Sequence, residues 1–117
     1  MPILNIRIVQ PEADIPAGLA QAVADAAGAV FQSHPQGTWV TVDALPGTRY
    51  AENGGAKDLP VFVDVLVGQW PEPSVMRSQA SEIAAAVAQA CARPVDNVHV
   101  IFAPAAKGRI AFGGKLG

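Results

Sequence analysis

The stretch ILNIRIV at residues 3–9 has a counterpart in FVDVLVG at residues 62–68, and this pair of segments decides the fold. Both stretches are rich in β-branched residues, and both are followed by polar residues punctuated by proline, which is typical of β-strands. Self-similarity within a chain points to a repeated structural unit. The sequence therefore predicts that each half of the chain opens with a strand.

A helix and a second strand are expected after each opening strand. Apolar residues recur at helical spacing over 16–32 and again over 74–92, with prolines near the start and beyond the end of both segments. Strand-like segments follow at 38–42 and 97–102. Each half thus reads as a β-α-β unit.

The two halves align at one constant offset without gaps. Pro35 matches Pro94, and the glycine pair Gly54-Gly55 matches Gly113-Gly114. We interpret this as a duplication within a single domain over residues 1–117, with repeats at 2–58 and 59–117.

Two right-handed β-α-β crossovers side by side predict an α/β (two-layer α+β) domain. Its four-stranded mixed sheet would carry both helices on one face. The other face is expected to be too apolar for water, so we expect other subunits to cover it in a closed oligomer.

Composition excludes several classes of function. The net charge of −2 and the lack of a basic stripe argue against nucleic-acid binding. No apolar run is long enough to span a bilayer, and the N-terminus lacks the pattern of a signal peptide, so a cytoplasmic protein without membrane contact is expected. Cys91 is the only cysteine, which excludes an internal disulfide, and we interpret it as core packing.

Metal and cofactor motifs are missing from the sequence. The two histidines lack the spacing of a metal site, and the glycines form neither a phosphate-binding loop nor a dinucleotide fingerprint. We therefore expect no metal and no cofactor.

A β-α-β duplication that begins Met1-Pro2 and carries a glycine pair at the end of each half resembles the tautomerase superfamily over essentially the whole chain. The tail AKGRIAFGGKL at 106–116 is similar to the C-terminal part of the single unit found in the short members. The resemblance is to the long members, which fuse two units and form trimers. It therefore implies a homotrimer.

The resemblance also implies that Met1 is removed and that the amine of Pro2 is the catalytic base. An α-amino group titrates near pH ~8 in peptides, and burial in an apolar site should lower its pKa toward neutrality. The counterpart in the second half is the internal Val61, and the neighbouring Pro60 has only an amide nitrogen. One catalytic amine per subunit follows. The implied activity is an isomerase (tautomerase) reaction that moves a proton within a small unsaturated keto acid or related carbonyl compound.

Histidines are candidates for substrate binding. His99 lies where several family members place an arginine or tyrosine that reaches a neighbouring subunit's proline, and it could bind a carboxylate or polarise a carbonyl. The alternative is a strand histidine at an interface. His34 lies at the end of the first helix and is a second candidate for substrate binding. The alternative is that it faces solvent near the C-terminal end of the helix dipole.

The segment after the second strand mixes a cation, a phenol, a carboxylate and an amide. Arg49 could clamp a carboxylate, Tyr50 or Asn53 could donate to an oxyanion, and Glu52 could orient a water. A solvated turn is the alternative reading.

Further candidates come from the apolar and basic residues of the tail and second strand. Trp39, Ile110 and Phe112 are expected in the pocket wall, with core or interface packing as the alternative. Arg109 is expected to clamp substrate or to form an intersubunit ion pair.

Departures from the family pattern keep other functions open. Glu12 stands near a position where a short member has an arginine, so a dicarboxylate substrate is not implied. A dehalogenase or decarboxylase would use a protonated Pro2. A ferredoxin-like ligand-binding module shares the same element order, and a tautomerase fold retained only for binding is a further alternative.

Overall fold

The computed structural model describes residues 2–11 and 14–117, so the expectations for Met1 and Glu12 fall outside the described residues. The first half contains the elements β1 (Ile3–Gln10), α1 (Leu19–Phe31) and β2 (Trp39–Pro46), followed by the 3-10 turn η1 (Gly47–Arg49). The second half contains β3 (Val61–Leu66), α2 (Pro73–Cys91), the 3-10 turn η2 (Val95–Asn97) and β4 (Val98–Phe102). A short hairpin, β5 (Ala111–Phe112) and β6 (Lys115–Leu116), ends the chain.

Two of the differences between the observed and predicted boundaries have a clear physical reason. Helix α1 starts at Leu19 because Gly18 takes a left-handed conformation with φ of 85°, which holds the preceding residues outside the helix. Strand β2 extends to Pro46 because its parallel ladder with β1 continues as far as Gln10.

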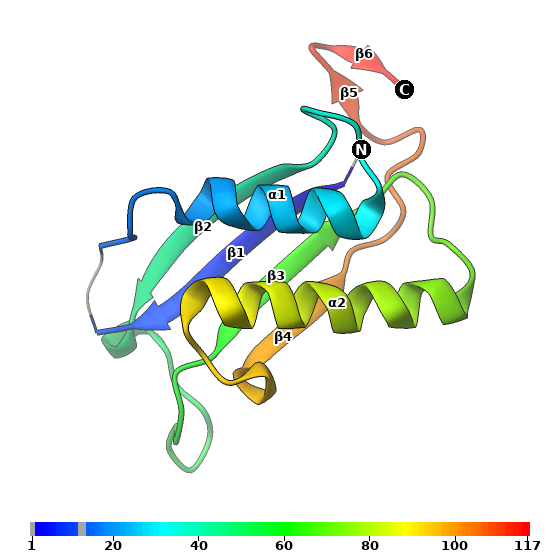
Figure 1. Cartoon of the computed structure of the whole chain (residues 1–117). Helices are drawn as coiled ribbons and strands as arrows, with labels where there is room; N and C mark the ends of the chain where they lie inside the picture. The colour runs from blue at the N-terminus through cyan, green and yellow to red at the C-terminus, as the bar shows by residue number, and fades with distance from the viewer. Residues whose placement is uncertain (1, 12–13) are drawn as a thin grey trace.

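The sheet has the order β2-β1-β3-β4. The pairs β1–β2 and β3–β4 are parallel, and β1 and β3 pair antiparallel in the centre. Both helices cover one face, as Figure 1 shows, which confirms the predicted two-layer fold. The two strands of each β-α-β unit are direct neighbours in this order, β1 beside β2 and β3 beside β4. In a ferredoxin-like sheet another strand lies between the two strands of a unit, so the ferredoxin-like alternative is wrong as a description of the fold.

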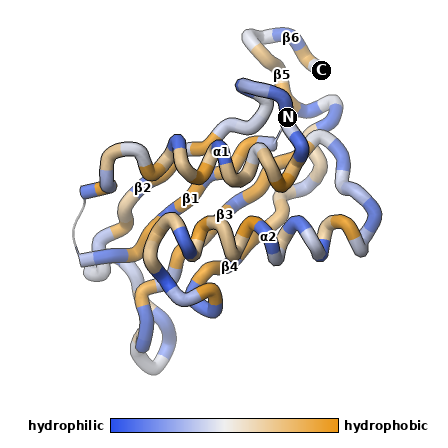
Figure 2. Tube along the Cα trace, viewed as in Figure 1, coloured by the Kyte–Doolittle hydropathy of each residue, from blue (hydrophilic) through white to orange (hydrophobic). Residues whose placement is uncertain are grey.

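The core lies between the sheet and the helices. Figure 2 shows hydrophobic residues along the strands that the helices cover. Alternate residues of the central strands, among them Ile6 and Val63, point toward the helices and are fully buried. Ile83 and Val87 of α2 meet them from the other layer. Cys91 is half-buried beside this core, in keeping with the packing role predicted for it.

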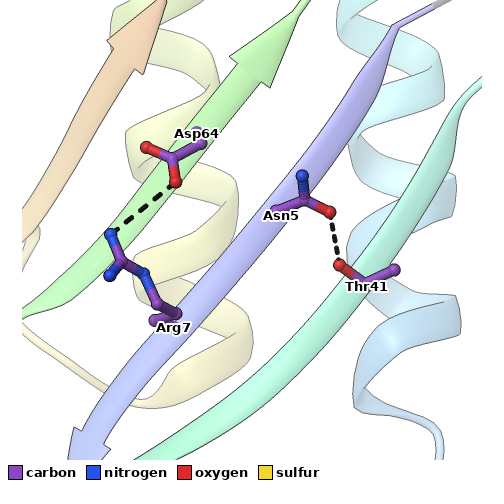
Figure 3. Close-up of polar contacts among 4 residues, drawn as sticks. All are labelled: Asn5, Arg7, Thr41 and Asp64. Carbon is purple, nitrogen blue, oxygen red and sulfur yellow. Dashed lines mark hydrogen bonds and ion pairs between the residues drawn. The ribbon is translucent and has the colours of Figure 1, made fainter.

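The open face of the sheet carries a row of polar side chains. Arg7 forms an ion pair with Asp64 at 3.7 Å, and Thr41 donates a hydrogen bond to Asn5 at 2.5 Å (Figure 3). The expectation that this face is strongly apolar was wrong, because the two-residue period of each strand sends its β-branched residues toward the helices. Exposed apolar side chains, such as Ile101, lie between the polar ones.

The two repeats diverge at their ends. Gly113 and Gly114 adopt positive φ values and turn the β5–β6 hairpin, whereas Gly54 and Gly55, also with positive φ, form a turn from which no described strands extend.

Candidate active site

A cavity of about 390 Å³ lies at the end of the sheet where β1 begins and β3 finishes. The antiparallel register places Ile3 opposite Leu66, so Pro2 lies beside the segment that follows β3. Pro2 is buried. The cavity is lined by parts of three segments: Pro2, Val67, Gly68, Gln69, Lys107, Ile110, Phe112 and Gly117.

The segment after β4 closes the cavity and is fastened by its backbone to the end of β3. The Ala106 N–H donates to the Val67 carbonyl and the Lys107 N–H donates to the Gly68 carbonyl, both at 2.9 Å. The guanidinium of Arg109 donates to two carbonyls of its own loop, those of residues 104 and 105. Arg109 therefore holds this loop in shape and is not among the residues that line the cavity of its own chain. Its expected role, as a substrate clamp or in an intersubunit ion pair, stays a prediction.

The wall of the cavity is aromatic on the side of the C-terminal hairpin. Phe112 packs edge-to-face against Trp39, with ring centroids 5.8 Å apart. The backbone N–H of Trp39 donates to the Pro2 carbonyl at 3.0 Å, which connects the start of β2 to the start of β1. The expected wall residues Ile110 and Phe112 thus lie together with Pro2, and Trp39 supports them from behind.

His99 and Tyr50 belong to a separate aromatic cluster on the open face. The ring of Phe62 lies 5.7 Å from His99 and 5.9 Å from Tyr50, and the Arg7 guanidinium lies over it at 5.7 Å. The Tyr50 hydroxyl donates to Glu52 at 2.5 Å. This hydrogen bond raises the pKa of Tyr50 above its ordinary value, and the nearby negative charge of Glu52 adds to the effect.

This aromatic cluster lies away from the Pro2 cavity of the same chain. His99 pairs with Phe62, four positions along β3 from Leu66, which corresponds to about 13 Å of extended strand. Arg49 and Asn53 lie on the same exposed connection as Tyr50, beyond the far end of β2. In Figure 1 this connection hangs at the opposite end of the sheet from the chain termini.

His34 lines a different and larger cavity. This second cavity, of about 710 Å³, runs along α1 and the start of the edge strand β2 and includes Trp39 and Val40. His34 Nδ1 lies 3.2 Å from the carbonyl of Pro35. We place the candidate site at the smaller cavity, because it contains Pro2 and the larger one does not.

Two lining residues with polar side chains, Lys107 and Gln69, were not predicted as site residues from the sequence. Lys107 falls in the tail whose Lys-Gly and Gly-Gly spacing carried the family resemblance, so its chemistry was available but not weighed. Gln69 lies shortly after the end of β3 and belongs to no sequence motif that would have identified it. In the part of the chain that the structure describes, no cluster of three His, Cys, Asp or Glu residues could hold a metal, and no helix is both long and apolar enough to cross a membrane.

No family model matches the sequence, and no curated protein matches it significantly. Solved structures match its shape. Pt0534, solved after inactivation by 2-oxo-3-pentynoate, gives a TM-score of 0.80 at 14% identity over 97% of this chain and 94% of its own. A fused 4-OT named Q0, a symmetric trimer, gives 0.79 at 16% identity over 94% of this chain and 90% of its own. The chain has the tautomerase-superfamily fold.

The tautomerase fold serves more than one reaction. FG41 malonate semialdehyde decarboxylase, solved with 3-bromopropiolate as inhibitor, also matches, with a TM-score of 0.71 at 14% identity over 95% of this chain and 88% of its own. At such identities the likeness establishes the fold, and the reaction has to be argued from the site itself.

Proposed function

We propose that this protein is a tautomerase, an isomerase in which the amine of Pro2 acts as a general base once Met1 has been removed. The position of Pro2 carries the proposal, because Pro2 is buried against a cavity whose walls include Ile110 and Phe112. Apolar surroundings disfavour an ammonium ion, so they favour a neutral amine that can accept a proton near pH 7.

The proposed reaction moves one proton within an enolised 2-keto acid or a related unsaturated carbonyl compound. The Pro2 nitrogen accepts the proton of the enol hydroxyl, and the electron pair of that O–H bond forms the carbonyl double bond. The electron pair of the C=C bond then takes the proton from the Pro2 nitrogen to form a new C–H bond. A positioned base of this kind typically contributes ~10²–10⁴-fold in rate. The enolate formed on the way needs hydrogen-bond donors, which the side-chain amide of the lining residue Gln69 can supply.

We also propose a homotrimer in the cytoplasm that acts on a small molecule without a cofactor. His99 and the loop from Arg49 to Asn53 lie beyond reach of their own Pro2, so they can contribute only to the cavity of a neighbouring copy. The trimeric state of the fused 4-OT with the same fold supports this arrangement. Exposed apolar side chains such as Trp39 and Ile101 on the open face also support it.

Decarboxylation is the second candidate, because a malonate semialdehyde decarboxylase shares the fold. That reaction, like dehalogenation, would use Pro2 in its protonated form. The two possibilities differ in their pH dependence, since a base loses activity on protonation and a cationic proline loses it on deprotonation.

The test compares the native protein with Pro2→Ala in the ketonisation of phenylenolpyruvate and 2-hydroxymuconate across pH. Intact mass first establishes that Met1 is absent from the native protein. We expect turnover that falls on the acidic side of a break near neutrality, and a loss of at least about 100-fold in Pro2→Ala.

Pro60→Ala is the matched control, because Pro60 adjoins the equivalent position of the second repeat and has no free amine. It should retain activity. Equal turnover by the native protein and Pro2→Ala would refute the proposal, and inactivity of both would favour decarboxylation, dehalogenation or a binding role.

A further inference from the structure

Lys107 stands apart from the other residues that line the Pro2 cavity. It is the only lining side chain with a formal charge among the described residues, since the others are apolar residues, glycines and the amide of Gln69. The side chain of Lys107 is exposed. The single ion pair within the described residues joins Arg7 to Asp64 on the open face, so none of the described carboxylate side chains pairs with Lys107.

The backbone of Lys107 is held from both sides. Its N–H donates to the carbonyl of Gly68 next to the start of β1, as described above. The N–H of the following residue, Gly108, donates to the carbonyl of Gly117 at 3.0 Å, and Gly108 takes the positive φ of 78° that this turn requires. The cation is therefore carried by a segment fixed on the same cavity that holds Pro2.

We infer that Lys107 binds the carboxylate of a substrate that has an apolar body. This inference rests on the proposed function of the cavity. One ammonium group can pair with one carboxylate. Ile110 and Phe112 line the same cavity and suit the apolar body of such a substrate. A volume of about 390 Å³ is in keeping with a ligand of this size.

Equilibrium binding tests the inference without relying on turnover. Isothermal titration calorimetry compares cinnamate with cinnamamide, which has nearly the same shape and no charge. We expect the native protein to bind cinnamate about tenfold more tightly than cinnamamide. Lys107→Gln should bind cinnamate and cinnamamide equally, and Lys107→Arg should restore the preference.

Lys115→Gln is the matched control, because Lys115 lies on β6 of the same tail and does not line the cavity. It should keep the native preference. The inference is overturned if the native protein binds neither probe or does not discriminate between them, and also if Lys107→Gln keeps the preference. Turnover by Pro2→Ala answers a separate question, so failure of the proposed base and failure of the carboxylate contact remain distinguishable.

Discussion

Arg93 joins three parts of the fold, and replacing it by methionine should lower stability by a magnitude that follows from its contacts. Its two terminal nitrogens donate to the carbonyl of Leu59 at 2.7 Å and to that of Val9 at 3.1 Å. These bonds connect the segment after α2 with the end of β1 and with the residues before β3. Arg93→Met keeps most of the aliphatic stem and removes both bonds.

The bond to Leu59 is exposed, whereas the bond to Val9 is partly buried. A hydrogen bond from a charged donor contributes about 1.5 to 3 kcal/mol, and less where water can replace it, so the loss should be about 2 kcal/mol. For a chain of 117 residues the entropy of unfolding is about 0.25 kcal/mol/K. The expected decrease in Tm is therefore about 8 °C.

Thermal unfolding followed by far-ultraviolet circular dichroism, at one fixed protein concentration, measures this decrease. Arg77→Met is the control, because Arg77 is exposed on α2 and the change in charge and volume is the same. A Tm of Arg93→Met within about 2 °C of that of Arg77→Met would refute the assigned role of the two carbonyl contacts.

Two further predictions concern single residues. Tyr50 is the only tyrosine, so an alkaline absorbance titration reports on it alone; Glu52→Gln should lower its raised pKa, and an unchanged titration would contradict the Tyr50–Glu52 hydrogen bond. Ala92 ends α2 with a φ of 53°, which disfavours any residue with a side chain, so Ala92→Gly should raise Tm by about 2–4 °C. Ala85→Gly, in the exposed middle of the same helix, should lower it instead, and a decrease in both variants would show that the terminal conformation carries no strain.

The fold could be predicted because its determinants are local and occur twice. Alternating β-branched residues in β1 and β3, and the helical spacing in α1 and α2, each specify an element and the face that it buries. The repeat then specifies how the elements connect. The polarity of the open face was missed because the strand segments were judged by their average composition, although Asn5, Arg7 and Asp64 all lie in the phase that points away from the helices.

The candidate site could be predicted only in part. Pro2, Ile110 and Phe112 were selected together and lie on one cavity, because the tail motif fixes their segment relative to the start of the chain. The strand pattern predicts on which face of the sheet His99 lies, but it does not predict whether His99 lies at the same end of the sheet as Pro2. That is determined by the antiparallel pairing of β1 with β3, a contact between the two repeats that neither repeat specifies by itself. Lys107 lies in the same tail, and backbone bonds to the residues after β3 hold it at the cavity. The tail motif contains this lysine but does not show that it lines the cavity.

The antiparallel pairing of the two repeats also has an evolutionary consequence. It makes the two ends of the sheet alike, because the start of β1 lies beside the end of β3 at one end and the start of β3 lies beside the end of β1 at the other. If the ancestral units were separate chains, every such end carried its own N-terminus, whereas fusion leaves Val61 in mid-chain at one of them. Under the proposed function, selection for proton transfer then acts on the Pro2 end alone. The opposite end, which carries Tyr50 and His99, can then change without altering the catalytic amine, so proton transfer and substrate recognition can adapt separately.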